Sequence, residues 1–330
     1  MNETLLEVKD LKVSFATYAG QVQAVRGVNF SLAKGEILAV VGESGCGKSV
    51  TAKSIIGLNP TPPSHVDGGQ ILLNGQDLVK LKEKEMRKLR GKNIGMIFQD
   101  PMTSLDPTKQ IGYQIMEAIV RHEKVSRKEA YARSVEMLEL VGINNPTQRM
   151  KQYPHEFSGG MRQRAMIAMS LVCNPQLLIA DEPTTALDVT IQAQILDLLR
   201  NLKDRINSSI MLITHDLGVI AEMADYVVVM YAGRVVEKGT AQEIFANPAH
   251  PYTIGLMASK PIVGKKVDRL YSIPGKVPNP VNMPNYCYFK DRCEMALPCC
   301  DGEYPCEISL SPTHKVSCYR YYENNRKAGE

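Results

Sequence analysis

A glycine-rich stretch near the N-terminus has the residues needed to bind phosphate groups. Gly42–Ser49, GESGCGKS, matches the pattern G-x-x-x-x-G-K-[ST] in full. The apolar run 36–41 before it predicts a buried strand, and 49–58 after it predicts a helix. In that context the loop N–H groups converge on phosphate oxygens and the helix N-terminus adds partial positive charge. The alternative, a glycine-rich turn that matches by chance, is disfavoured by this context.

Two side chains of the loop have distinct chemical tasks. Lys48 can reach the β- and γ-phosphates of a nucleotide, and the Ser49 hydroxyl can bind Mg²⁺. The residues expected to contact the nucleotide are Gly42, Glu43, Ser44, Gly45, Cys46, Gly47, Lys48, Ser49 and Val50, of which Cys46 occupies a variable position and contributes no chemistry.

Two adjacent carboxylates follow another predicted strand. The segment 177–183, LLIADEP, is apolar until Asp181 and Glu182. Asp181 at the strand end is suited to the Mg²⁺ shell, and Glu182 is suited to polarise an attacking water. Alone, two acids after an apolar run more often begin a solvated helix. With a complete phosphate-binding loop earlier in the chain, they predict nucleotide hydrolysis.

A second helix terminus is suited to bind phosphate. In the segment 157–164, FSGGMRQR, Ser158 has the chemistry of an N-cap, and Gly159 and Gly160 permit close approach of a ligand. One phosphate-binding loop does not need two such termini for one γ-phosphate. We therefore expect this terminus to act on a nucleotide held by another subunit.

The elements that must position these residues alternate along the chain. Residues 5–41 predict half-buried strands, and three later apolar runs predict buried strands separated by helices, among them a helix over 189–206. This order predicts an α/β fold with a mainly parallel sheet. The interval 100–175 is mostly helical and predicts an inserted helical subdomain. We expect one nucleotide-binding domain over 1–260 and a small cysteine-rich extension over 261–330.

Composition limits the possible functions of the 330-residue chain. The net charge of +4 is too small to favour a nucleic-acid partner, and there is no run of eighteen apolar residues to span a membrane. The N-terminus has early acidic residues and does not resemble a secretory signal. These features predict a cytosolic protein.

The motifs together resemble the ATP-binding-cassette (ABC) family, in its order and approximate spacing, over about residues 5–250. The resemblance lies in GESGCGKS, FQDP with Gln99, FSGGM, LLIADEP, TTALD with Asp188, and LITHD with His215. The signature differs from LSGGQ at Phe157 and Met161 but keeps its serine and both glycines. The family's fold is a RecA-like core with an N-terminal antiparallel β subdomain and an inserted helical subdomain.

This resemblance implies two cassettes paired head to tail with ATP between them. Tyr18, with Phe15 as the alternative, would stack on adenine. Gln99 would touch Mg²⁺ and the attacking water and signal to a membrane subunit. His215 would contact the γ-phosphate. The implied sets are Glu182, His215, Gln99 and Lys48 for catalysis, Ser49, Gln99 and Asp181 for Mg²⁺, and Ser158, Gly159, Gly160 and Asp188 acting in trans.

Longer segments are similar to the oligopeptide/dipeptide importer branch, including QYPHEFSGGMRQR and NPAHPYT with His250-Pro251-Tyr252. The branch implies peptide import by a membrane-peripheral subunit on the cytoplasmic face. Its partners would be a second ATPase, two permeases and an extracytoplasmic binding protein. Nickel or another small solute is an alternative cargo. A soluble ABC ATPase acting on nucleic acid or ribosomes is the alternative of another class.

Six of the eight cysteines lie in the tail, between residues 287 and 318. The spacing has no Cys-x-x-Cys pair, which disfavours zinc, and matches no ferredoxin pattern, so spacing alone does not name a cofactor. A reducing compartment disfavours disulfides. The resemblance implies a [4Fe–4S] cluster on Cys287, Cys293, Cys300 and Cys318, with zinc as the alternative and Cys299 as a possible replacement for Cys300.

Overall fold

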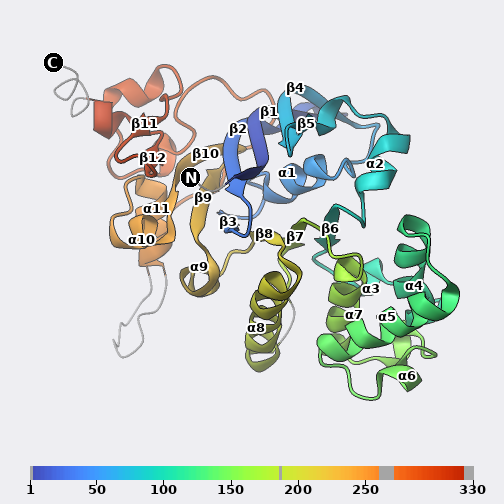
Figure 1. Ribbon diagram of the computed structural model, residues 1–330. Coiled ribbons are helices and arrows are strands. Elements are labelled where there is room, and N and C mark those ends of the chain that lie inside the picture. Colours follow the sequence, from blue (N-terminus) through green and yellow to red (C-terminus); the bar gives the residue numbers. More distant parts are fainter. Residues whose placement is uncertain (1–2, 186–187, 260–270, 323–330) are drawn as a thin grey trace. The chain divides into compact units, whose positions relative to one another are not determined.

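The structure is a computed structural model that describes residues 3–185, 188–259 and 271–322. The chain divides into two compact units (Figure 1). The first comprises the described residues of Met1–Leu5, Leu32–Ile37 and Lys80–Ile213. The second comprises those of Leu6–Ser31, Leu38–Val79 and Thr214–Glu330. The domain boundary expected near residue 260 lies outside the described residues, and the division at that point stays a prediction.

The second unit contains an antiparallel sheet with the order β2-β1-β4-β5. Leu6 pairs with Leu73 and Val8 with Ile71, so apolar side chains from both strands lie on one buried face. This alternation is the pattern that predicted half-buried strands. The strands are β1 (Thr4–Thr17), β2 (Gly20–Ala33), β4 (Ser64–Leu73) and β5 (Gln76–Asp77).

A second set of strands in this unit is built around a fully buried strand. β3 pairs in parallel with β9, β9 pairs antiparallel with β10, and β10 pairs antiparallel with β12 of the tail. The strands are β3 (Ile37–Val41), β9 (Tyr226–Tyr231), β10 (Arg234–Thr240), β11 (Ile308–Ser309) and β12 (Lys315–Val316). The helices are α1 (Lys48–Ile55), α9 (Leu217–Met223), α10 (Ala241–Ala246) and α11 (Pro251–Ala258), with short 3₁₀ turns at Lys290–Arg292, Pro298–Asp301 and Tyr319–Tyr321.

The first unit contains three parallel strands in the order β8-β7-β6, and β7 and β8 are buried along their whole length. In Figure 1, α4, α5 and α7 lie together within this unit. The strands are β6 (Ile94–Ile97), β7 (Leu177–Asp181) and β8 (Ser209–Ile213). The helices are α2 (Glu83–Leu89), α3 (Pro101–Ser104), α4 (Ile111–His122), α5 (Arg127–Leu140), α6 (Pro146–Arg149), α7 (Gly159–Leu171) and α8 (Val189–Ile206), with 3₁₀ turns at Leu78–Lys80 and Pro154–Glu156.

The expected α/β class with buried parallel strands is confirmed, and α8 has the expected bounds. Two details differ. The helix expected over 49–58 begins one residue earlier and ends at Ile55, shortly before Gly57, whose φ of +64° does not continue a helix. The tail, whose sequence predicted no particular strand, contributes β11 and β12, and β12 extends the ladder of β10.

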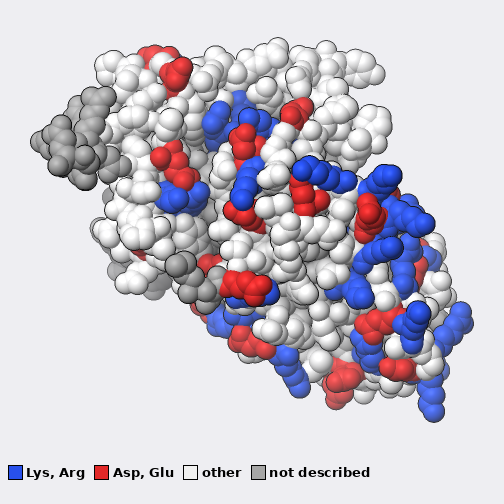
Figure 2. Space-filling view, turned by 45° about the horizontal axis from the view of Figure 1, so that its top comes forward, with Lys and Arg blue, Asp and Glu red and all other residues white. Residues whose placement is uncertain are grey.

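The helices and the surface charge of the structure can be compared with what the composition predicted. Among the described residues, no helix is long and apolar enough to cross a membrane. The face shown in Figure 2 has Lys and Arg side chains interspersed with Asp and Glu, without one continuous basic stripe.

A completely buried carboxylate joins three segments of the second unit. Glu237 of β10 accepts hydrogen bonds from the backbone N–H groups of Ala249 at 2.7 Å and His250 at 2.8 Å. Its carboxylate also lies 2.8 Å from Nε2 of His314, just before β12. His250 in turn accepts from the N–H of Tyr252 and caps α11, and burial lowers the pKa of this histidine to about 4. Glu237 therefore fixes both the start of α11 and the docking of the tail strand.

We expect Glu237→Ala to lower the free energy of unfolding of the second unit by about 3 kcal/mol, because two buried N–H groups lose their acceptor. Urea unfolding followed by circular dichroism measures this loss. Glu307→Ala is the matched control, because Glu307 is a half-exposed partner of Lys238 and Lys315 in the same region. It should cost less than about 0.5 kcal/mol. Equal effects of the two substitutions would contradict the junction role of Glu237.

Candidate functional site

The phosphate-binding loop runs from the end of β3 into α1, in the second unit. A Cβ atom added at Gly42 would lie 2.2 Å from the carbonyl oxygen of Met230, and one added at Gly47 would lie 2.4 Å from that of Ala24. Gly47 also has a φ of +91° and forms the N-cap of α1. Only glycine fits either position. The loop therefore lies directly against the backbones of β9 and β2, with the N-terminus of α1 at its end.

Lys48 and Cys46 occupy the inner part of this loop. Lys48 is buried, and its Nζ donates to the carbonyl oxygens of Gly42 at 2.7 Å and Glu43 at 3.0 Å. The ammonium group thus lies within the loop, where phosphate oxygens are expected. Cys46 is completely buried, and burial raises the pKa of its thiol. Such a thiol is inert, as expected for a position without a chemical role.

Glu43 is held by two residues far along the chain. Its backbone N–H donates to the hydroxyl oxygen of Tyr252 at 2.8 Å. Its carboxylate accepts two hydrogen bonds from Arg292, at 2.9 and 3.1 Å. The sequence identified the His-Pro-Tyr element that contains Tyr252 and the cysteine-rich tail that contains Arg292. It did not connect them with the loop, because neither motif indicates where the chain returns.

The other expected site residues of the second unit are exposed. Tyr18 lies in the turn between β1 and β2 with its side chain fully exposed, and Phe15 on β1 is half-buried. His215 is exposed between β8 and α9. The ring of Tyr18 is thus accessible in this turn, and which of the two aromatic residues contacts adenine stays a prediction.

The acidic pair of the first unit has a distinctive geometry. Asp181 ends β7 and is buried. Glu182 follows with a φ of +48°, a left-handed conformation that is uncommon for this residue type and concentrated at functional sites. Its Oε2 accepts from Nε2 of Gln99 at 3.1 Å and from the hydroxyl of Thr185 at 2.8 Å. The structure thus brings the expected base and the expected water-positioning residue together.

The signature segment forms the start of α7, also in the first unit. Ser158 is the N-cap and accepts from the N–H of Met161 at 3.4 Å, as its sequence context predicted. Gly159 has open space where a Cβ would be. Gln163, one turn on, donates to the carbonyl oxygen of Pro183 at 2.5 Å. The signature helix is therefore tied to the loop that follows the acidic pair.

Asp188 is exposed and is the N-cap residue of α8. The expected site residues thus form two groups, each in its own unit. One group is the loop Gly42–Ser49 with Val50, Tyr18 and His215, and the other is Gln99, Ser158, Gly159, Gly160, Asp181, Glu182 and Asp188.

The tail cysteines differ in burial and environment. Cys300 and Cys318 are buried, Cys287 and Cys293 are half-buried, and the remaining two tail cysteines are exposed. Burial, together with the smaller effect of Cys300, Cys318 and Cys293, raises the pKa of Cys287 to about 12. These four thiols therefore lie in one environment. Within residues 3–185, 188–259 and 271–322, no three potential ligands are arranged to hold a single metal ion.

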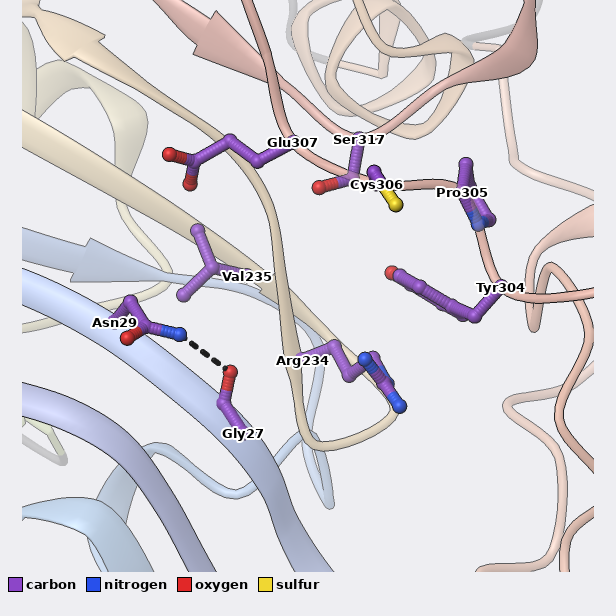
Figure 3. Close-up of a pocket in the computed structure, with 9 residues that line it drawn as sticks. All are labelled: Gly27, Asn29, Arg234, Val235, Tyr304, Pro305, Cys306, Glu307 and Ser317. Carbon is purple, nitrogen blue, oxygen red and sulfur yellow. Dashed lines mark hydrogen bonds between the residues drawn. The ribbon is translucent and has the colours of Figure 1, made fainter. Parts of the chain in front are cut away.

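One of the two exposed tail cysteines, Cys306, lies at a surface pocket. Cys306 lines a surface pocket with residues from β2, β10 and the tail (Figure 3). The guanidinium of Arg234 lies 4.1 Å from the ring centre of Tyr304 on one side of this pocket. Cys306 is exposed and is not one of the four proposed ligands.

Comparisons with known proteins identify the family of the chain. A family model described as "ABC transporter" matches residues 25–185, and one described as "Oligopeptide/dipeptide transporter, C-terminal region" matches residues 236–300. The chain is 57% identical to the "Oligopeptide transport ATP-binding protein OppD" of Bacillus subtilis, over 96% of this chain and 88% of that protein. It is 54% identical to the "Dipeptide transport ATP-binding protein DppD" of the same organism, over 96% and 95% of the two chains.

Solved structures show the same fold. The chain resembles cbiO1 from Clostridium perfringens, part of the ABC transporter complex cbiONQ, with a TM-score of 0.64, 28% identity, and coverage of 74% of this chain and 92% of that one. It also resembles the ADP- and phosphate-bound ATP-binding cassette MJ0796, with a TM-score of 0.65 and 24% identity over 72% and 99% of the two chains. The chain therefore belongs to the ATP-hydrolysing ABC transporter subunits, in the branch that has the oligopeptide/dipeptide transporter C-terminal region.

Proposed function

We propose that this chain powers the import of dipeptides or oligopeptides. The observation that carries this proposal is the match to peptide-transport ATPases over 96% of the chain, which includes the C-terminal region as well as the cassette. No relative named here supports the nickel alternative. As a member of the family, the chain is membrane-associated and works with permease subunits. We further propose a cytoplasmic location, a second similar ATPase as partner and an extracytoplasmic binding protein in the full complex.

The residues of the chain divide the catalytic work in this proposal. The loop Gly42–Ser49 binds the ATP phosphates, and Tyr18 stacks on the adenine. Ser49, Gln99 and Asp181 provide oxygen atoms for Mg²⁺. Glu182 polarises the attacking water, supported by the hydrogen bonds that orient its carboxylate. His215 contacts the γ-phosphate.

The signature acts on the nucleotide of the partner ATPase. Ser158 presents the N-terminus of α7, a 13-residue helix whose first-turn N–H groups and dipole favour an anion. Gly159 leaves space for that anion, and Gly160 and Asp188 contribute to the seam between the two cassettes. ATP binding closes the pair and hydrolysis reopens it.

The tail thiols are proposed to bind a [4Fe–4S] cluster through Cys287, Cys293, Cys300 and Cys318. Their shared environment supports this set, because burial raises the pKa of Cys287 and Cys318 and other thiols of the set raise both values too, so the four lie close together. The cluster would supply thiolate–iron bonds that fold the tail.

We expect Glu182→Gln to keep ATP binding and closure of the ATPase pair while lowering turnover at least about 100-fold, because the amide cannot accept a proton from water. Phosphate release by the assembled transporter measures turnover, and retention of labelled ATP measures binding. Glu139→Gln, an exposed site on α5, is the matched control and should turn over normally. Undiminished turnover by Glu182→Gln would refute its role as the base.

We expect the protein purified without oxygen to be brown and to contain about four irons per chain. Cys300→Ser should lose most of this iron, because the buried thiol is a proposed ligand. Cys299→Ser, which changes the exposed neighbouring thiol, should retain it. Iron analysis and visible absorbance measure both. Colourless protein containing zinc would refute the cluster, and the reverse pattern for the two serine variants would refute the assignment of Cys300.

A further inference from the structure

The second unit contains an ion pair whose two members come from the nucleotide loop and the cysteine-rich tail, 249 residues apart. Glu43 belongs to the phosphate-binding loop, and Arg292 belongs to the 3₁₀ turn Lys290–Arg292. The pair is bidentate, with N···O distances of 2.9 and 3.1 Å. Parallel N–H···O bonds of this kind fix both geometry and charge.

The burial and hydrogen bonds of Arg292 fix its side chain in the position from which it contacts Glu43. Its side chain is only 6% exposed, against 27% for that of Glu43. Its Nε donates to the carbonyl oxygen of Pro274 at 2.7 Å, and one terminal nitrogen lies 3.3 Å from the hydroxyl of Tyr231. Two partners besides Glu43 therefore hold the guanidinium, so its position does not depend on Glu43 alone.

Aromatic packing fixes the same part of the tail. The ring of Phe289 lies 5.2 Å from that of Tyr231 and 5.5 Å from that of Tyr252, both centre to centre. Tyr252 itself accepts the hydrogen bond from the backbone N–H of Glu43. Both the backbone and the side chain of this loop residue are therefore held by one cluster that joins β9, α11 and the tail.

The negative charge of Glu43 gives the ion pair with Arg292 a consequence for ATP binding. A carboxylate in a loop that binds polyphosphate repels its ligand, and this repulsion is strong where burial reduces screening. The guanidinium of Arg292 neutralises this charge and holds the carboxylate through two hydrogen bonds. Without it, the loop would present a negative charge to ATP.

We propose that Arg292 is a positioning residue for ATP binding, acting from the tail through the Glu43 carboxylate. It does not touch the nucleotide. Because Arg292 immediately precedes Cys293, the fold of the tail also places this guanidinium. An ordered tail is then a condition for tight ATP binding at the loop. This inference rests only on nucleotide binding by the loop, and it is independent of the cargo.

The test is a double-mutant comparison of the dissociation constant of Mg-ATP, measured on the full chain. We expect Arg292→Gln to raise this constant about tenfold or more by exposing the carboxylate. Adding Glu43→Gln to that variant should recover most of the lost affinity, because the repelling charge is then gone. Raising the salt concentration should also reduce the difference between Arg292→Gln and the unmodified chain.

Lys290→Gln is the matched control. Lys290 is a cation of the same 3₁₀ turn, but it pairs with Asp301 within the tail. It should leave the dissociation constant unchanged. Should Arg292→Gln fail to fold, Arg292→Lys serves instead, since it keeps the charge but loses the bidentate geometry, and a smaller loss that Glu43→Gln again relieves is expected.

The outcomes separate this inference from the proposed function. An unchanged dissociation constant in Arg292→Gln overturns the inference, as does a loss that Glu43→Gln does not relieve and salt does not reduce, since that pattern indicates only loosened structure. Failure of the unmodified chain to bind Mg-ATP would instead refute the proposed function.

Discussion

The position of the phosphate-binding loop depends on backbone contacts that leave no room for a side chain. Gly42 lies against the carbonyl of Met230 in β9, and Gly47 against that of Ala24 in β2. The loop is therefore positioned by strands, the most rigid part of its surroundings, and not by adaptable side chains. Phosphate binding requires N–H groups whose directions are set before the ligand arrives. Direct contact between the backbones of the loop and the strands fixes these directions.

The tail packs against the rest of the second unit chiefly through charged and aromatic groups. The few apolar residues that bury together there, Ala249, Val316 and Cys318 with Tyr321, form a small cluster that contributes modest hydrophobic stabilisation. Glu237 and Arg292 each make several hydrogen bonds, which offsets the desolvation cost of burying a charge. Such contacts specify one geometry more strongly than they stabilise it. The tail can thus transmit its own state of order to the loop.

The sequence predicted the features that depend on local patterns. The buried strands β3, β7 and β8 and the helix α8 follow from apolar periodicity, and the N-cap role of Ser158 follows from its place before a helical segment. It could not predict the pairing of Glu43 with Arg292, because local patterns contain no information about where a chain returns after 249 residues. The two-residue strand β12 is too short to have a pattern. The left-handed conformation of Glu182 is imposed by its surroundings and is not encoded by residue type.

The spacing of the tail cysteines does not distinguish Cys299 from Cys300 as the proposed ligand, but the turn in which they lie gives them different burial. Both residues lie in the 3₁₀ turn Pro298–Asp301, and successive side chains in such a turn project about 120° apart. One of two neighbours can therefore face the interior only if the other faces away. Cys300 is buried among the other three thiols, its Sγ accepts from the N–H of Leu297 at 3.4 Å, and Cys299 is exposed. The turn that buries Cys300 therefore leaves its neighbour exposed, and this burial is the observation behind the proposal that Cys300 is the ligand.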